Sequence, residues 1–401
     1  MKIVGILTEF NPFHSGHAYL LEELRHRLGE DTGIVCVMSG NFVQRGEPAL
    51  LEKHVRAEAA VRCGADLVLE LPVARALASA EHFATGAIYM MQKSGAITHL
   101  AFGSECGDVA AMQSVADCLL SDEYAAAVKK HLKAGLPFAL CRQRAVEEIL
   151  GGEAAALLEG ANNSLGVEYL KAAERCGWDC SPVTVPRRGA AHDSAETAEF
   201  LSGTKLRALL RAGDWETVER YVPQAAAGLY RNAVTQGRGP VSLETGERML
   251  LATLRTMEET DFECLPDCGE GLHHRFYKAV RETGSTVQLL EAVKTKRYAH
   301  ARLRRILMCA WLEIDREAAQ EMPQYLRVLS ANGRGREIIQ KMNECASLPM
   351  LTKPASVRML SERAQAQFRL EARATELYGL LYPEISAAKA AQEWKISPRM
   401  V

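Results

Sequence analysis

The first 17 residues constrain the fold of this chain more than any other stretch. Lys2–Leu7 is an apolar run typical of a buried strand, and Ala18–Leu28 has the spacing of a helix. A turn with Asn11-Pro12 and the sequence His14-Ser15-Gly16-His17 lie between them. A helix that begins beside the end of a buried strand presents free N–H groups and the positive end of its dipole. The order therefore predicts a site for an anion such as a phosphate.

The residue types of this turn indicate what the site can do. His14 and His17 are three residues apart, so both imidazoles can face one bound anion. Gly16 allows the backbone to approach a ligand closely. Two imidazoles and several backbone donors would stabilise the charge that develops when a phosphorus atom of a triphosphate is attacked. We interpret the motif as a nucleotide-binding, adenylyl-transferring site; the structural alternative is a turn capped by a histidine.

Strands and helices alternate over residues 1 to about 105. The expected strands are Lys2–Leu7, Gly33–Met38, Asp66–Leu71 and His99–Phe102, with helices at Ala18–Leu28, Glu52–Cys63 and Ala80–Lys93. Apolar strands that alternate with helices predict an α/β fold with a Rossmann-like, doubly wound parallel sheet. Ligands of such sheets lie beyond the carboxyl ends of the strands. Residues 14–17, 39–41 and 103–105 should therefore line one crevice.

The rest of the chain is expected to be mostly helical. A fifth strand is expected at Ser181–Val185 and a linker at Asn232–Gly239. We therefore expect an HxGH-type catalytic domain over residues 1–230, followed by a mostly α-helical domain over residues 240–401.

A second motif, Ser202-x-Thr204-x-Leu206-Arg207, opens a helix that should end near Gly213. Ser202 could simply cap this helix, and Arg207 could be a solvated surface charge. Together with the histidine motif, we expect instead that the hydroxyls of Ser202 and Thr204, with Lys205 or Arg207, hold the far end of the triphosphate. Arginine would do so with its planar fork of donors and lysine with a point charge. The predicted catalytic residues are thus His14, His17, Ser202, Thr204 and Arg207.

The segment 294–305 is strongly basic. It holds six cationic residues and no acidic residue in twelve positions. Helix faces exposed to solvent usually mix the two signs of charge, whereas an excess of positive charge suits a phosphate backbone. Tyr298 and His300 lie among these residues and could stack on bases. We predict RNA contact by Lys294, Lys296, Arg297, Arg302, Arg304 and Arg305.

The composition of the chain limits which classes of protein it can belong to. With 48% apolar residues, 24% charged residues and a net charge of −2, the chain resembles an ordinary globular protein, not a wholly basic one. No apolar run is long enough for a membrane span, and no leader precedes the first strand, so we expect a cytoplasmic protein. The eleven cysteines are expected to be reduced thiols. The pairs Cys176/Cys180 and Cys264/Cys268 enclose three residues each, where zinc sites usually enclose two, so no metal site is predicted.

The motifs in this order resemble a known family. The histidine motif with Ser202-x-Thr204-x-Leu206-Arg207 is similar to the HxGH nucleotidyltransferase superfamily. The stretches 9–17, 38–48, 102–105 and 294–297 more closely resemble the bacterial tRNA(Met) cytidine acetate ligases. The resemblance implies ATP as the cofactor, together with Mg²⁺, and activation of acetate as acetyl-adenylate. The exocyclic amine of the wobble cytidine of elongator tRNA(Met) then takes the acetyl group, which gives N4-acetylcytidine.

The same resemblance implies a set of ATP contacts. The sequence does not decide whether Arg187 or Arg188 contacts the nucleotide. The segment that follows, Gly189–Asp193, is one residue shorter than the usual motif of the family and lacks its tyrosine. The full set is Leu7, Thr8, Glu9, Phe10, Asn11, Pro12, Phe13, His14, Gly16, His17, Leu20, Gly103, Asn162, Asn163, Arg187 and Arg188. With its basic segment, the helical domain is expected to be the tRNA-binding part. No protein partner is inferred.

Two other functions remain compatible with the sequence. One is an adenylyltransferase that joins ATP to a phosphorylated small molecule; such an enzyme generally needs only the first domain. The other is a tRNA-binding protein that holds ATP without catalysis.

Overall fold

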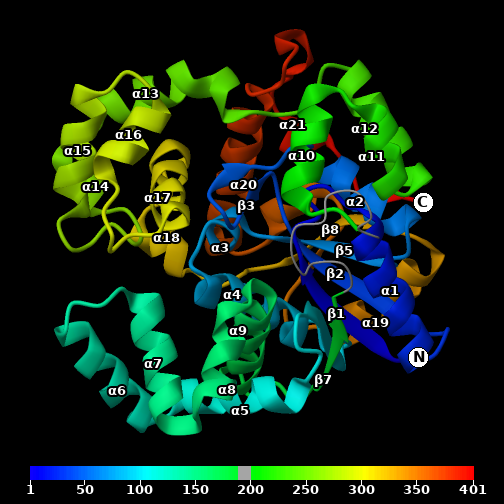
Figure 1. Ribbon diagram of the computed structural model, residues 1–401. Coiled ribbons are helices and arrows are strands. Elements are labelled where there is room, and N and C mark those ends of the chain that lie inside the picture. The colour runs from blue at the N-terminus through cyan, green and yellow to red at the C-terminus, as the bar shows by residue number, and fades with distance from the viewer. Residues whose placement is uncertain (188–199) are drawn as a thin grey trace.

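A mixed β-sheet covered by helices on both faces forms the centre of the molecule (Figure 1). The structure is a computed structural model that describes residues 1–187 and 200–401. Within these residues the sheet has the strand order β10-β8-β5-β2-β1-β6-β7, and β9 pairs with β8. The strands are β1 (Ile3–Thr8), β2 (Gly33–Ser39), β5 (Leu67–Leu71), β6 (His99–Ser104), β7 (Ser181–Pro186), β8 (Leu326–Ala331), β9 (Met350–Leu351) and β10 (Arg399–Met400).

The doubly wound topology predicted from the sequence is confirmed. The chain runs outward from β1 through β2 to β5, and then from β6 to β7 on the other side of β1, and all four pairings are parallel. The strand order thus reverses between β1 and β6, which is where open α/β sheets bind ligands. All five predicted strands are present, with ends that differ by one or two residues.

Helices cover both faces of this sheet. One face packs against α1 (Ser15–Leu28), α2 (Lys53–Arg62), α10 (Gly203–Ala212), α11 (Trp215–Tyr221) and α12 (Gln224–Thr235). The opposite face packs against α4 (Ala80–Lys93), α5 (Val109–Leu120), α9 (Ala161–Arg175) and α19 (Gly333–Cys345). Every residue of β1 and β2 is buried, as expected for strands that are covered on both sides. Two short strands, β3 (Phe42–Val43) and β4 (Glu47–Pro48), form a separate hairpin.

A helical lobe follows, at the upper left of Figure 1. It contains α13 (Glu247–Thr256), α14 (Glu259–Glu263), α15 (Leu272–Glu282), α16 (Thr286–Val293), α17 (His300–Leu312) and α18 (Arg316–Gln320). Its core also includes residues of α3 (Val73–Ala76) and of α20 (Glu362–Gly379), and Phe42 of β3 lies edge-on to Trp311. The helices α6 (Asp122–Lys133), α7 (Phe138–Leu150) and α8 (Gly152–Ala156) form a further group between β6 and β7.

Residues 240–401 are mostly helical, but their second half also contains strands that the sequence did not predict. Leu326–Ala331 forms strand β8, which pairs antiparallel with β5 inside the main sheet. The expected linker is also wrong in its first half, because α12 continues to Thr235. Periodicity could not predict β8, because a six-residue apolar run fits a buried helix or a strand equally well.

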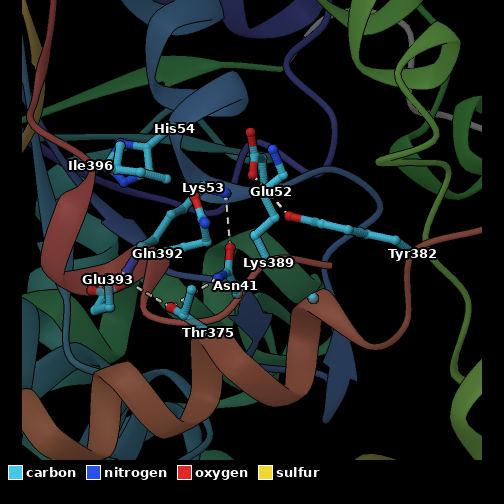
Figure 2. Close-up of a pocket in the computed structure, with 11 residues that line it drawn as sticks. Asn41, Glu52, Lys53, His54, Thr375, Tyr382, Lys389, Gln392, Glu393 and Ile396 are labelled. Atoms are coloured by element: carbon cyan, nitrogen blue, oxygen red, sulfur yellow. Dashed lines mark hydrogen bonds and ion pairs between the residues drawn. The ribbon is translucent and has the colours of Figure 1, made fainter. Parts of the chain in front are cut away.

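Buried charges hold the returning chain against the sheet. Glu393 of α21 (Gln392–Lys395) accepts hydrogen bonds from Lys53 Nζ (2.6 Å) and Thr375 Oγ1 (2.6 Å), and it also contacts Arg327. Figure 2 shows Glu393 facing Thr375, with Asn41 bridging toward Lys53. Lys53, Arg327 and Glu393 are each at most 3% exposed. In the described residues, no helix is both long and apolar enough to cross a membrane.

Candidate active site at the carboxyl ends of β1 and β6

His14 is the N-cap of α1, so this helix begins at Ser15, three residues earlier than predicted. His17 therefore lies in the first helical turn. The two imidazole rings are stacked, with centroids 3.8 Å apart and an interplanar angle of 29°. The ring of His17 also lies edge-on to Phe10 at 5.0 Å. The histidine cap that the sequence offered as the structural alternative is thus present, and the same turn also places the two imidazoles side by side.

Hydrogen bonds fix the protonation state of both rings. The amide of Gly16 donates to His14 Nδ1 (3.1 Å), and the amide of His14 donates to His17 Nδ1 (3.2 Å). A neutral imidazole that accepts at Nδ1 carries its proton on Nε2. Burial, with a smaller effect of the Arg187 charge, lowers the pKa of His14 to about 4. Burial and the neighbouring His14 place the pKa of His17 well below its ordinary value. Near neutral pH, both rings are therefore neutral donors at Nε2.

Contacts from distant segments hold the turn before α1. Phe10 has a positive φ of 46°, a strained conformation for a residue with a side chain. Asn11 Oδ1 accepts from the amide of Leu50 (2.8 Å). The amide of Phe13 donates to the Tyr230 hydroxyl (3.0 Å), which in turn donates to the Phe13 carbonyl (3.2 Å). The turn is therefore fixed from both sides, and it positions the first residues of α1.

Arg207 contacts the same turn. Its Nη1 donates to the Asn11 carbonyl (2.8 Å) and its Nη2 donates to Thr204 Oγ1 (3.0 Å). Ser202 is the N-cap of α10, where its hydroxyl accepts from the amide of Lys205 (3.3 Å), and α10 ends at Gly213 as predicted. Thr204 is exposed. The three residues thus lie beside the histidine motif, with Arg207 directed at the backbone of the turn and Ser202 acting as a cap.

Residues from three further segments meet at the ends of β6 and β7. Glu105 accepts from the amides of Asn162 (3.0 Å) and Asn163 (2.6 Å), so a carboxylate occupies the N-terminus of α9. Although burial alone would raise it, the hydrogen bonds from Asn162 and Asn163 lower the pKa of Glu105. Arg187 Nη1 donates to Asn162 Oδ1 (3.1 Å).

Gly103 lies beside Arg187. A Cβ atom at Gly103 would lie 3.5 Å from Cγ of Arg187, an ordinary van der Waals contact. The charge of Arg187 also acts on His14 and His17. The predicted residues Gly103, Asn162 and Arg187 therefore lie on the same side of the sheet edge as the histidine pair. Arg188 lies outside the described residues.

Comparisons with known proteins decide which family these features represent. The model of the HIGH Nucleotidyl Transferase family matches residues 1–393. The tRNA(Met) cytidine acetate ligase of Caldanaerobacter subterraneus is 38% identical, with 97% of this chain and 98% of the relative covered. That of Syntrophomonas wolfei is 35% identical, with 99% of each covered. The chain belongs to the tRNA(Met) cytidine acetate ligase family.

A solved structure agrees with this assignment. The crystal structure of Thermotoga maritima TmcAL bound with alpha-thio ATP is 35% identical and matches with a TM-score of 0.93, covering 100% of this chain and 99% of that chain. The apo structure of the same protein matches with a TM-score of 0.94. The relationship therefore extends over the fold as a whole, including strand β8 and the helical lobe.

The basic segment of this family member is only partly available to RNA. Tyr298 is 5% exposed, so the expectation that it stacks on bases is wrong. Arg305 is 9% exposed and faces Asp267. Other cations of the segment are held within the protein: Lys294 by the Tyr298 carbonyl, Arg302 by the Asp267 carbonyl and Arg304 by Glu47. In the described part of the chain, only Lys296 and Arg297 of these six are exposed without a side-chain partner.

The loop after β2 carries the β3–β4 hairpin, which packs against the helical lobe. Gly46 has a φ of +76°, and a side chain there would lie 2.5 Å from the backbone nitrogen of Arg305, so glycine permits the β3–β4 hairpin to contact α17. Arg45 remains exposed, and its charge acts on Glu9 and Arg207.

Two supporting residues were not found from the sequence. Arg56 is fully buried and donates to the carbonyls of Leu51 (2.8 Å), Glu9 and Ser39, which ties α2 to the ends of β1 and β2. Tyr230 supports the histidine turn from 217 residues away. Neither has a local signal, because an arginine in a helix is usually solvated and a tyrosine in a helix usually packs in a core.

Among the described residues, no group of three histidine, cysteine, aspartate or glutamate side chains is arranged to hold a metal ion, and all eleven cysteines are free.

Proposed function

We propose that this protein activates acetate with ATP and transfers the acetyl group to the exocyclic amine of the wobble cytidine in elongator tRNA(Met). The observation that carries the proposal is the stacked pair His14 and His17 at the start of α1, with both Nε2–H groups available. The names of the relatives, and the ATP analogue bound to the Thermotoga protein, support the same reaction.

In the first step, a carboxylate oxygen of acetate attacks the α-phosphorus of ATP, and pyrophosphate leaves. Neutral imidazole donors suit this step because they offer hydrogen bonds to the phosphoryl oxygens, where negative charge develops. The N-terminus of α1 adds backbone donors and a favourable dipole. No protein nucleophile is needed, since the reaction depends on orientation and on neutralisation of charge.

Arg187 is suited to bind the nucleotide beside the histidine pair, because its charge acts on both imidazoles. It is exposed, yet its guanidinium is oriented by Asn162, whose helix end is held by Glu105. Arg207 acts differently in this proposal. Its bonds to Asn11 and Thr204 make it a positioning residue that holds the turn before His14.

Mg²⁺ is proposed as the counter-ion of the phosphates. It prefers phosphate oxygens, one or two carboxylates and retained waters over a full cage of protein ligands. The described residues offer no such cage, which fits an ion held mainly by the nucleotide. When bound, the ion would neutralise charge on the leaving pyrophosphate.

In the second step, the cytidine amine attacks the acetyl carbon of the mixed anhydride. The bond between this carbon and the bridging oxygen breaks, AMP leaves with that oxygen, and the amine nitrogen loses one proton. The exposed Lys296 and Arg297 of the helical lobe are the residues of the basic segment best suited to contact the RNA backbone. Residues 240–401 would thus deliver the tRNA, although part of this region also completes the sheet.

The test uses the full-length protein, ATP, ¹⁴C-acetate and unmodified elongator tRNA(Met). We expect acetate-dependent exchange of pyrophosphate into ATP without tRNA, and N4-acetylcytidine at the wobble position with tRNA. An adenylyltransferase for a phosphorylated small molecule would show no dependence on acetate. A non-catalytic tRNA-binding protein would show neither reaction.

A further inference from the structure

The helices α6 and α7 form a hairpin whose connected ends are basic. Residues 124–146 contain five lysine and arginine residues and no acidic residue. The acidic residues of the two helices lie at their far ends: Asp122, Glu123, Glu147 and Glu148. The hairpin has a small core of its own, formed by Val128, Cys141 and Ala145, and it packs on α5. Its function is not explained by the reaction at the ends of β1 and β6.

Three of these cations are available to a ligand. Lys129, Lys133 and Arg144 are exposed, and their side chains have no partner in the described residues. Lys129 and Lys133 are one helical turn apart, so they share a face of α6. The other two cations are engaged, since Lys130 pairs with Glu148 (3.1 Å) and Arg142 with Glu168 (2.6 Å).

The end of the hairpin is also apolar. Phe138, the first residue of α7, is 60% exposed, and Leu132 near the end of α6 is 45% exposed. Among the described phenylalanine, tyrosine and tryptophan residues, only Phe138 is exposed. An exposed aromatic ring among cations is the combination that binds unpaired nucleotides, because the ring stacks on a base while the cations contact phosphates.

The position of the hairpin fits an extended ligand. In Figure 1, α6 and α7 project at the lower left and α14–α18 at the upper left, both on the same side of the sheet. The exposed Lys296 and Arg297 belong to the segment between α16 and α17 in the upper group. A ligand with a long phosphate backbone could therefore contact both groups at once.

We propose that the tip of the α6–α7 hairpin is a second RNA-contact surface. In this proposal, Lys129, Lys133 and Arg144 contact phosphates, and Phe138 stacks on an unpaired base. The inference rests on the proposed function for its identification of the RNA as tRNA. It goes beyond that function because it assigns RNA binding to an insertion of the catalytic sheet, outside the helical lobe.

The test measures binding of unmodified tRNA(Met) to the full-length protein by fluorescence anisotropy at several salt concentrations. The hairpin variant is K129Q/K133Q/R144Q. The matched control is K2Q/R336Q/K341Q, which removes three exposed cations near the N-terminus and α19, at the right of Figure 1. Thermal unfolding reports whether each variant is folded.

We expect the hairpin variant to bind at least tenfold more weakly and to lower the slope of log K against log salt by about 2, because each neutralised phosphate contributes roughly 0.7–0.9 to that slope. Phe138→Ala should bind about fivefold more weakly with an unchanged slope, since stacking releases no counter-ions. The control should bind as the unaltered protein does.

Two results would overturn the proposal. One is a hairpin variant that binds tRNA as tightly as the control. The other is a Phe138→Ala variant that keeps its tRNA affinity but loses self-association in size-exclusion chromatography, which would make the tip a contact with a second copy of this chain. Failure of the proposed function is separate, because it would appear as an absence of acetate-dependent pyrophosphate exchange in the unaltered protein.

Discussion

The guanidinium of Arg207 donates to the main-chain carbonyl of Asn11 at 2.8 Å, which joins α10 to the turn that precedes the histidine pair. A hydrogen bond from a charged donor contributes about 1.5–3 kcal/mol. From the motif alone, Arg207 was expected to bind phosphate. The contact gives it another role, because the arginine holds the backbone of the turn in place.

Arg207→Ala should therefore reduce both stability and catalysis. We expect the free energy of unfolding to fall by about 1–3 kcal/mol, since the Asn11 carbonyl is left without its partner. The rate of acetate-dependent pyrophosphate exchange should fall as well, because His14 and His17 follow directly from this turn. Urea unfolding and the exchange assay measure the two effects. Arg211→Ala, an exposed position on the same helix, is the control and should change neither.

The protonation of His14 predicts how stability depends on pH. Its pKa in the folded protein is about 4, whereas the unfolded chain takes up the proton near 6.5. Between these values the unfolded state binds more protons, so the free energy of unfolding should fall as the pH drops from 6.5 toward 4. The contribution of His14 is full above pH 6.5 and amounts to about 3 kcal/mol.

Urea unfolding at a series of pH values measures this dependence. His14→Asn should show a shallower decline over the same interval, because asparagine does not titrate. An equally steep decline in the variant would show that His14 is not held neutral in the folded protein.

The burial of Glu393 predicts that its loss strongly lowers the stability of the fold. Glu393→Ala leaves the two buried cations Lys53 and Arg327 to share Glu70 as their one remaining ion-pair partner. Removal of one partner from a buried ion-pair group typically costs about 3–5 kcal/mol. Chemical denaturation measures the decrease in stability. Glu216→Ala, which breaks the exposed pair with Arg220, is the control and should cost less than about 1 kcal/mol. Equal effects of the two substitutions would contradict the proposed role of Glu393 in holding the C-terminal segment to the sheet.

The exposed cations of the helical lobe make a prediction about RNA. K296E/R297E should weaken tRNA binding and flatten its salt dependence, because charges that contact phosphates release counter-ions on binding. R336E/K341E on α19 changes the net charge equally and should have little effect. Binding isotherms at several salt concentrations separate the two variants. If both reversals act alike, the effect reflects net charge and not a contact surface.

The sequence predicts those parts of the site that are formed by residues close together in the chain. The Ile3–Leu7 run, the turn and His-x-Gly-His are contiguous, so the strand, the start of the helix and their relative position follow from spacing alone. The capping role of Ser202 and the end of α10 at Gly213 also follow from local rules.

The rest depends on contacts between distant segments. Tyr230 and Arg207 support a turn about 200 residues earlier in the chain, and β8 enters the sheet beside β5 from residue 326 onward. Tyr298 looked available because its neighbours are charged, yet it is buried in the core of the helical lobe. The charge pattern of a segment shows which residues are polar, but it does not show which of them already have partners within the protein.

Acetate-dependent exchange of pyrophosphate into ATP in His17→Ala tests the central claim most directly. His26→Ala is the matched control, since His26 is an exposed histidine on the same helix. Removal of a positioned donor to the transition state should slow exchange by about 10²–10³-fold in His17→Ala, whereas His26→Ala should exchange at the unaltered rate. A His17→Ala protein that exchanges as fast as His26→Ala would show that the phosphates of ATP do not react against the histidine pair.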